Sequence, residues 1–189
     1  MKQNRVSPLS GRRMTAAEYR DTPLGPPWFQ LIDGLLIQEP SPTDGHQRCV
    51  GNLYLVLAHW ARQSGCGVVR IAPLDVWLSE KDVVQPDIFF VSSESQERLR
   101  SDGLHGAPDL AVEVLSPSNA TLDLTKKRAL YERTGAKELW LIDPVNKRLT
   151  TERFAAPSSP QTTVHSVGDT FSSPLLPGLA IPVAEIFRA

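Results

Sequence analysis

The sequence predicts an α/β domain with a mixed β-sheet. Three observations lead to this class. Segments with helical and with strand-like patterns alternate along the 189 residues. The longest segment repeats its apolar residues every three or four positions, whereas the other apolar runs are short and rich in Val, Ile and Leu. Hydrophobic residues make up 41% of the chain and charged residues 22%, which suits one domain with an ordinary core.

The first part of the chain predicts an arm, a short helix and a hairpin. We expect residues 1–13 to form a flexible arm and residues 14–189 to form a single domain. Thr15 and Glu18 match a capping box, which predicts a short helix at the start of the domain. The Asp33-Gly34 pair inside the apolar residues 29–37 is typical of the tight turn of a β-hairpin.

A long helix is predicted next, from about Gly45 to Ser64. Asp44 can cap its N-terminus, and Gly65 ends it. The apolar residues at helical spacing, which we expect to face the core, are Val50, Leu53, Leu57 and Trp60.

The second half alternates strands with one further helix. Apolar runs bounded by Gly, Pro or Asp predict strands at residues 68–72, 75–78, 87–91, 109–115, 138–143 and 148–154, with a weaker one near 162–166. A helix from about 122 to 134 ends at Gly135. The polar residues 92–106 predict a short helix and a loop, and the apolar tail at 175–187 predicts a closing segment that ends in a short helix.

The overall charge gives little attraction to nucleic acid. The formal net charge is −1 and the isoelectric point is about 6.4, so contact with nucleic acid would need a local basic patch. Cys49 and Cys66 lack the spacing of a metal or redox motif. The first residues do not resemble a signal peptide, and no apolar stretch is long enough to span a membrane. We therefore expect a cytoplasmic protein with reduced thiols.

Glu113 is the most informative residue. It is the only charge in the apolar run 110–115. A buried carboxylate is too costly to keep unless a metal ion, a cation or hydrogen-bond donors accompany it. Because alternate residues of a strand share a face, Glu113 points away from Leu110, Val112 and Val114. The sequence must therefore supply it with a partner.

Two acidic residues could share a cation with Glu113. Asp109 lies four residues away on the same strand, so its Cα is roughly 13 Å from that of Glu113. Carboxylates that share one cation must bring their oxygens within about 2.6 Å of it, which makes Asp109 a poor partner. Asp87 opens a different strand, and neighbouring strands lie about 4.8 Å apart. We expect Asp87 to lie beside Glu113.

Helix phasing adds a lysine and a histidine. Lys127 lies three residues after Leu124 and four before Tyr131, so it shares their face, whereas Lys126 points elsewhere. A lysine on a packed face needs an acceptor, and this helix follows the Glu113 strand. His46 begins the inward stripe of the long helix and can face a cleft at the helix N-terminus, where phosphate is also favoured.

Two carboxylates, a divalent cation and a lysine suit the hydrolysis of a phosphodiester. The cation neutralises phosphate charge and lowers the pKa of bound water, and the lysine stabilises the transition state or positions the water. A small set of oxygen ligands favours Mg²⁺ or Mn²⁺.

Each residue also has a purely structural interpretation. Asp87 could cap the entry to its strand, and Glu113 could pair with a core arginine. Lys127 could extend its ammonium group to solvent. His46 could simply belong to a capped helix.

Several segments match the motifs of a known family. They are residues 85–91 (QPDIFFV), 107–118 (APDLAVEVLSPS) and 135–144 (GAKELWLIDP), with Asp123, Lys127 and Tyr131 at intervals of four. Weaker matches are residues 29–34 (FQLIDG), the step from Pro42 to His46 and residues 177–179 (PGL). Over about residues 15–187 the chain resembles the Uma-two family of restriction-endonuclease-like proteins.

This resemblance implies a restriction-endonuclease-like core of the PD-(D/E)XK nuclease superfamily and a Mg²⁺- or Mn²⁺-dependent DNA endonuclease. It implies Asp87 and Glu113 as metal ligands. The usual pattern ends Glu-x-Lys, but position 115 is Leu115, and the family's lysine is expected on the next helix, which matches Lys127. Nucleases of this type often pair subunits, so we expect a homodimer. Surface for self-association would come from the apolar tail and from Trp28, Trp60, Trp77 and Trp140.

The chain departs from the family at Gln30. Members often have glutamate just before the Leu-Ile-Asp-Gly step, and an amide is a poorer ligand that cannot act as a base. Gln30 and the near-neutral charge favour a rival function, a non-catalytic module that keeps the nuclease fold to bind nucleic acid or protein. We expect Gln30, His46 and Tyr131 to line the cleft in either case.

Overall fold

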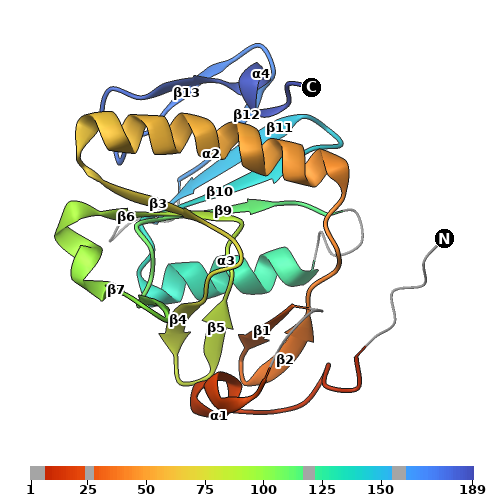
Figure 1. Ribbon diagram of the computed structural model, residues 1–189. Coiled ribbons are helices and arrows are strands. Elements are labelled where there is room, and N and C mark those ends of the chain that lie inside the picture. Colours follow the sequence, from red (N-terminus) through yellow and green to blue (C-terminus); the bar gives the residue numbers. More distant parts are fainter. Residues whose placement is uncertain (1–6, 24–27, 117–121, 155–160) are drawn as a thin grey trace.

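The computed structural model describes residues 7–23, 28–116, 122–154 and 161–189. Within these ranges the protein is a mixed α/β fold (Figure 1). Its helices are α1 (Ala16–Asp21), α2 (Asp44–Ser64), the 3₁₀ helix η1 (Ser93–Arg98), α3 (Leu122–Thr134) and α4 (Val183–Ile186).

The strands of the described ranges form two six-stranded mixed sheets and a small two-stranded one. The first, here called the hairpin sheet, has the order β2 (Leu35–Gln38), β1 (Phe29–Ile32), β5 (Asp82–Val84), β4 (Val76–Ser79), β8 (Gly103–His105) and β7 (Leu99–Arg100). The second, here called the central sheet, has the order β12 (Gln161–Ser166), β11 (Arg148–Arg153), β10 (Glu138–Asp143), β9 (Leu110–Val114), β6 (Ile88–Ser92) and β3 (Gly67–Ile71). The small sheet pairs β13 (Thr170–Ser172) with β14 (Ala180–Pro182).

The presence of two large sheets corrects the prediction of one mixed sheet. The sequence did not reveal β5, which has only three residues. This short strand pairs with β1 on one side and with β4 on the other. It therefore joins the N-terminal hairpin to β4 in a sheet of their own, apart from β6 and β9.

Most of the local predictions are confirmed. The capping box of Thr15 and Glu18 opens α1. Asp33 and Gly34 form the hairpin turn with φ angles of 51° and 73°, the positive values that a tight type I′ turn requires. The cap of α2 is a correction: Thr43, and not Asp44, accepts the N–H of His46, because the hydroxyl of an extended residue before the helix reaches that group.

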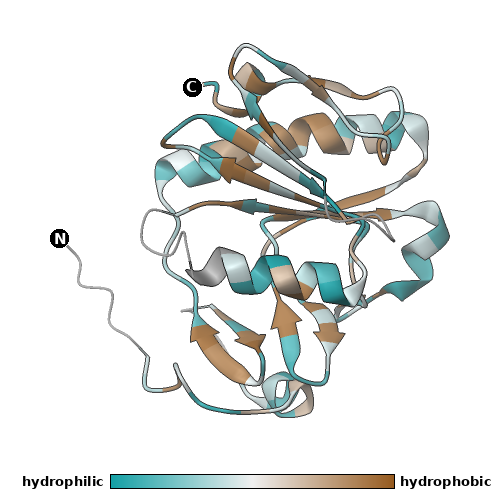
Figure 2. Cartoon of the chain, turned by 180° about the vertical axis from the view of Figure 1, so that it is seen from behind, coloured by the Kyte–Doolittle hydropathy of each residue, from teal (hydrophilic) through white to brown (hydrophobic). Residues whose placement is uncertain are grey.

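The layers are stacked in a simple order. The central sheet lies between α2 and α3, and the hairpin sheet lies on the other side of α3 (Figure 1). The predicted stripe of α2 packs on one face of the central sheet and is fully or almost fully buried. Helix α3 is largely hydrophilic although it lies between two sheets that carry many apolar residues (Figure 2). Polar side chains of α3 are thus held inside the protein.

Both terminal segments of the described ranges pack against the rest of the fold, including part of the arm that the sequence predicts to be flexible. Residues 1–6 of the predicted arm lie outside the described residues, and the following segment runs along β2, where the N–H of Gly11 donates to the carbonyl of Leu36 at 2.8 Å. The tail packs into the core through Leu176, Ile181 and Ile186. None of the described helices is long and apolar enough to cross a membrane.

Candidate functional site

Glu113 is buried, with 6% of its surface exposed, and its two oxygens have different partners. The hydroxyl of Tyr131 donates to Oε1 at 2.7 Å, and Nζ of Lys127 lies 3.1 Å from Oε2. Both partners come from α3, and both are buried. Lys126 is exposed, as the helix phasing predicts. Strand β9 and helix α3 are therefore joined through one carboxylate.

The groups around Glu113 shift its pKa in opposite directions. Burial raises the pKa of Glu113 to about 7, and the charges of Asp87 and Glu39 act in the same direction. The ammonium group of Lys127 and the hydroxyl of Tyr131 act against them. The carboxyl group therefore binds a proton more readily than an exposed glutamate does, and the charge of Lys127 opposes this.

Asp87 lies next to Glu113, as predicted. The antiparallel register of β6 and β9 pairs Ile88 with Val112, so one further step places Asp87 opposite Glu113. Oδ2 of Asp87 accepts the N–H of Val114 at 2.8 Å. Among the described residues, Oδ1 of Asp87 has no hydrogen-bond partner.

Asp109, which the spacing argument rejected, belongs to a different part of the structure. Its carboxylate accepts the N–H of Ser92 at 2.8 Å and lies 2.7 Å from Nζ of Lys137. It is therefore a structural residue that ties β9 to its neighbours.

His46 reaches the same place from the first turn of α2. Its Nε2 lies 3.3 Å from Oδ2 of Asp87. Burial alone would lower the pKa of His46, but the hydrogen bond with Asp87 and the nearby negative charges outweigh burial and raise it. Nδ1 of His46 is buried and has no hydrogen-bond partner among the described residues.

The hairpin contributes Gln30 and Glu39, and the sequence did not single out Glu39. Nε2 of Gln30 donates to Oε1 of Glu39 at 2.6 Å, and that oxygen is 3.9 Å from Nζ of Lys127. Oε1 of Gln30 is buried without a partner in the described part of the chain. The hairpin register pairs Phe29 with Gln38, so the next residue, Glu39, lies close to Gln30. That register, drawn out from the predicted turn, could have revealed the third carboxylate.

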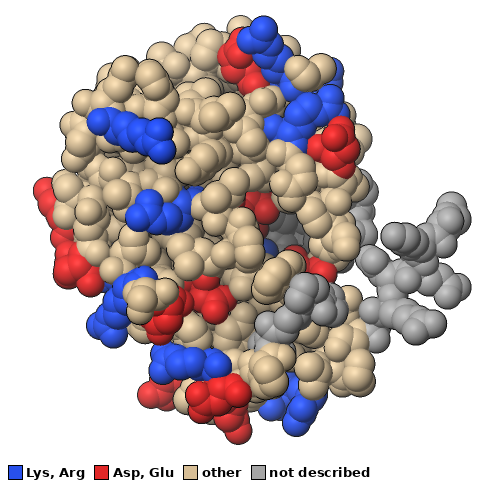
Figure 3. Space-filling model, in the orientation of Figure 1, with Lys and Arg blue, Asp and Glu red and all other residues tan. Residues whose placement is uncertain are grey.

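These residues line one cavity of about 230 Å³. The residues of the cavity wall that bear on its chemistry are Gln30, Glu39, His46, Asp87, Glu113 and Lys127. Tyr131 lies behind Glu113 and is fully buried, so the prediction that it lines the cleft is replaced by a role in holding Glu113. Figure 3 shows a hollow bordered by acidic atoms. The positive and negative side chains of the described residues on this face are interspersed and form no large basic patch.

A family model described as "Uma2: Putative restriction endonuclease" matches residues 16–184. The chain belongs to the Uma2 family. This agrees with the resemblance that the motifs indicate. No curated protein matches the chain.

Among solved structures, this Uma2 chain resembles a "putative nuclease belonging to DUF820" from Anabaena variabilis ATCC 29413. The two share 22% sequence identity and superpose with a TM-score of 0.79. The match covers 92% of this chain and 97% of the other. At this level of identity the likeness shows a common fold.

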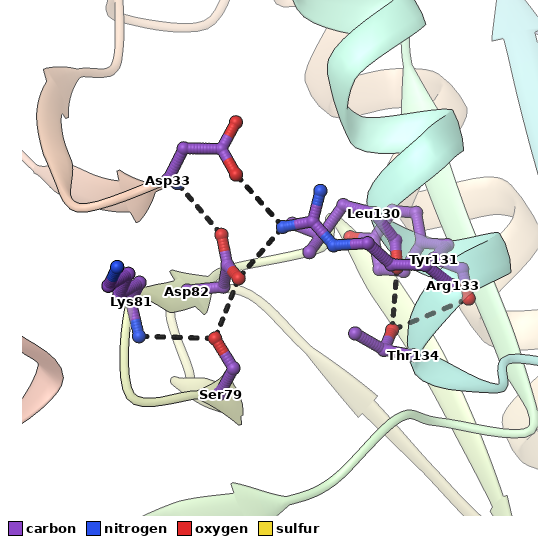
Figure 4. A network of polar contacts seen from close by, with 8 residues as sticks. All are labelled: Asp33, Ser79, Lys81, Asp82, Leu130, Tyr131, Arg133 and Thr134. Carbon is purple, nitrogen blue, oxygen red and sulfur yellow. Dashed lines mark hydrogen bonds and ion pairs between the residues drawn. The ribbon is translucent and has the colours of Figure 1, made fainter.

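In this Uma2 member a polar network fixes α3 against the hairpin sheet (Figure 4). Nη2 of Arg133 donates to Asp33 at 3.0 Å and to Asp82 at 2.9 Å. Asp82 is buried and also accepts the N–H of Asp33 and the hydroxyl of Ser79. The network anchors the C-terminal end of the helix whose earlier turns carry Lys127 and Tyr131.

The carboxylate oxygens of Asp87 and Glu113 and their negative charges suit a small hard cation. Magnesium binds through one or two carboxylates and keeps several waters. Asp87, directly before β6, and Glu113, on the adjacent strand β9, offer two carboxylates. Among the described residues, no three His, Cys, Asp or Glu side chains are already arranged around one point.

Proposed function

We propose that the protein is a Mg²⁺- or Mn²⁺-dependent DNA endonuclease with a restriction-endonuclease-like core. One observation carries the proposal. A buried carboxylate, Glu113, a second carboxylate, Asp87, and a buried ammonium group, Lys127, come from three separate segments of the chain and line one cavity. Buried charges are costly, and groups of this kind gather where the chemistry needs them.

The side chains divide the work between them. Asp87 and Glu113 would hold the cation, which when bound neutralises phosphate charge and lowers the pKa of a bound water. Lys127 lies beside Glu113 and can donate to a phosphate oxygen whose charge grows in the transition state. Tyr131 keeps Glu113 in place through its hydroxyl group. His46 holds Asp87 from the other side and sits in the first turn of α2, an end that favours a phosphate group.

A second function, the non-catalytic binding module, is favoured by a different observation. Both oxygens of Glu113 already have partners, and Gln30 replaces the glutamate that the family often has. In that case the ion pair of Lys127 and Glu113 would be a permanent structural contact, and the cavity would bind a ligand without cleaving it.

Plasmid nicking in the presence of Mn²⁺ separates the two functions. We expect wild-type protein to nick the plasmid, and Asp87→Ala and Lys127→Ala each to lose at least about 100-fold in rate. Lys126→Ala is the matched control, because Lys126 belongs to the same helix and is exposed. Equal rates in all four proteins would contradict the proposed site. A wild-type protein that binds DNA and leaves it intact would favour the binding module.

The homodimer and the cytoplasmic location stay predictions. The sequence suggested four tryptophans as surface for self-association. Three of them are at most 9% exposed, and only Trp28 is open to solvent, with 47% of its surface exposed. Sedimentation of the purified protein would measure its oligomeric state directly.

A further inference from the structure

A second cavity lies next to the first and shares part of its wall. It has a volume of about 260 Å³, and Trp28 and Gln85 line both cavities. The remaining wall of the second cavity includes Tyr19, Arg20 and Asp75. Trp28 and Gln85 therefore lie between the two cavities.

Trp28 differs from the other tryptophans in its exposure. Its surface is 47% exposed, whereas those of the other three are between 0% and 9% exposed. Its carbonyl accepts the N–H of Glu39 at 2.9 Å, which keeps the residue beside the carboxylates of the site. An exposed indole ring at the edge of a polar cavity offers a stacking surface for a planar partner.

The polar groups of the second cavity include both donors and acceptors. The guanidinium group of Arg20 lies over the ring of Trp77, 4.6 Å from its centroid, and keeps about half of its side-chain surface exposed. Oδ1 of Asp75 accepts from Nε2 of Gln85 at 2.8 Å and from the hydroxyl of Tyr19 at 3.2 Å. Within the described ranges, Oδ2 of Asp75 and Oε1 of Gln85 have no hydrogen-bond partner.

The exposed ring of Trp28 and the polar groups of the second cavity favour one class of ligand, a nucleobase. The carboxylate of Asp75 and that of Asp102 on the same wall disfavour a phosphate group. A purely apolar ligand would cover the polar atoms of this wall without offering them hydrogen-bond partners. A nucleobase has a flat apolar face with donors and acceptors on its edge, and a volume near the lower end of ligand pockets, roughly 300 Å³, suits a single base.

We propose that the second cavity binds one nucleobase of the DNA strand whose phosphate lies in the first cavity, with Trp28 as the stacking surface. This inference rests on the proposed function, because it takes the strand to be the substrate. A base paired in a duplex does not expose its faces, so the cavity requires a single-stranded or flipped nucleotide. The substrate class is therefore DNA with unpaired bases next to the bond that is cleaved.

Binding can be measured apart from cleavage. In EDTA we would titrate the whole protein with a short oligothymidylate and with an abasic deoxyribose phosphate of the same length and charge, each carrying a fluorophore for anisotropy. We expect the oligothymidylate to bind about tenfold more tightly than the abasic strand. Trp28→Ala should remove this difference, and Trp28→Phe should keep most of it because a ring remains. Leu55→Ala, a change at an exposed residue of α2, should alter nothing.

The outcomes distinguish this inference from the proposed function. Equal binding of the two strands by wild-type protein, no binding of either, or unchanged base preference in Trp28→Ala would each overturn the inference, even if the protein cuts DNA in Mn²⁺. Base-dependent binding that is lost in Trp28→Ala would support it even in a protein that cleaves nothing. Cleavage that prefers single-stranded over duplex DNA in wild type but not in Trp28→Ala would support both.

Discussion

Lys127 and Glu113 form a buried ion pair, with Nζ 3.1 Å from Oε2, that links helix α3 to strand β9. The hydroxyl of Tyr131 fixes the other oxygen of Glu113, and the cavity leaves the carboxylate accessible to a ligand. A cation that binds here must share Glu113 with Lys127. Metal binding should therefore depend strongly on this one carboxylate.

Glu113→Gln should abolish stabilisation by metal. At a Mn²⁺ concentration about ten times the Kd, the melting temperature of wild-type protein should rise by about 3–6 °C, and that of the variant should not change. Thermal unfolding followed by fluorescence measures this. Asp109→Asn is the control and should keep the rise, since Asp109 directly precedes the same strand but pairs with Lys137 away from the cavity. An equal rise in Glu113→Gln would remove Glu113 from the metal site.

Tyr131→Phe should lower the free energy of unfolding and leave the folded structure unchanged. The variant loses the hydrogen bond to Oε1 of Glu113, and a bond to a charged, buried acceptor contributes about 1.5–3 kcal/mol. We expect the free energy of unfolding in urea to fall by that amount. Tyr54→Phe is the control, because the hydroxyl of Tyr54 makes no hydrogen bond within the described residues, and it should change the free energy by less than about 0.5 kcal/mol. Equal losses in the two variants would show that the hydroxyl of Tyr131 contributes nothing specific.

Asp109→Asn should destabilise the protein in a pH-dependent way. Burial alone would raise the pKa of Asp109, but Lys137 and the N–H and side chain of Ser92 outweigh burial, and the pKa lies below its ordinary value. Because the folded pKa is the lower one, the carboxylate stabilises the fold above the unfolded value of about 3.9, and this contribution is lost as the pH falls through the folded pKa. At neutral pH we expect the variant to be about 1–3 kcal/mol less stable.

Urea unfolding at a series of pH values between neutral and about 3 tests the sign of this effect. The difference between wild type and Asp109→Asn should shrink as the pH approaches the acid end of the series. A difference that stays constant would mean that Asp109 acts through its shape and hydrogen-bonding geometry, with no contribution from its charge.

The sequence predicts the individual elements better than their assembly. Turn and capping chemistry act over a few residues, so the hairpin at Asp33-Gly34 and the start of α1 follow from the residues alone. The division into two sheets depends on β5, whose three residues form a strand only because β1 and β4 already flank them. A strand of three residues is too short to show a periodic pattern from which the sequence could predict it.

The site shows the same contrast. Alternation in a strand and phasing in a helix identify Glu113 and Lys127, because both side chains must point into the protein. Glu39 could not be found in this way, since it follows its strand and stands next to Pro40 in what reads as a loop. Its role is set by a contact across the hairpin, with Gln30, and by a longer one to Lys127. Contacts between elements decide which polar residues join a site.

Gln30→Glu tests whether this cluster can hold a cation. Gln30 is 1% exposed, and its amide donates to Glu39 at 2.6 Å. A carboxylate in its place would face another carboxylate with no proton between them, and this repulsion should lower the free energy of unfolding by about 1–3 kcal/mol in EDTA. A divalent cation would offset the repulsion, so we expect Mn²⁺ to restore most of the loss. Urea unfolding in EDTA and in Mn²⁺ measures both effects.

Gln30→Leu separates charge from the loss of the hydrogen bond. This variant also removes the donor to Glu39 but adds no carboxylate, so it should lose stability in EDTA and recover no more in Mn²⁺ than wild type gains. If Mn²⁺ stabilises Gln30→Glu no more than Gln30→Leu, then Glu39 and position 30 lie outside the reach of a bound cation. If Gln30→Glu recovers and also nicks plasmid faster than wild type, then the amide at position 30 limits the activity of the natural protein.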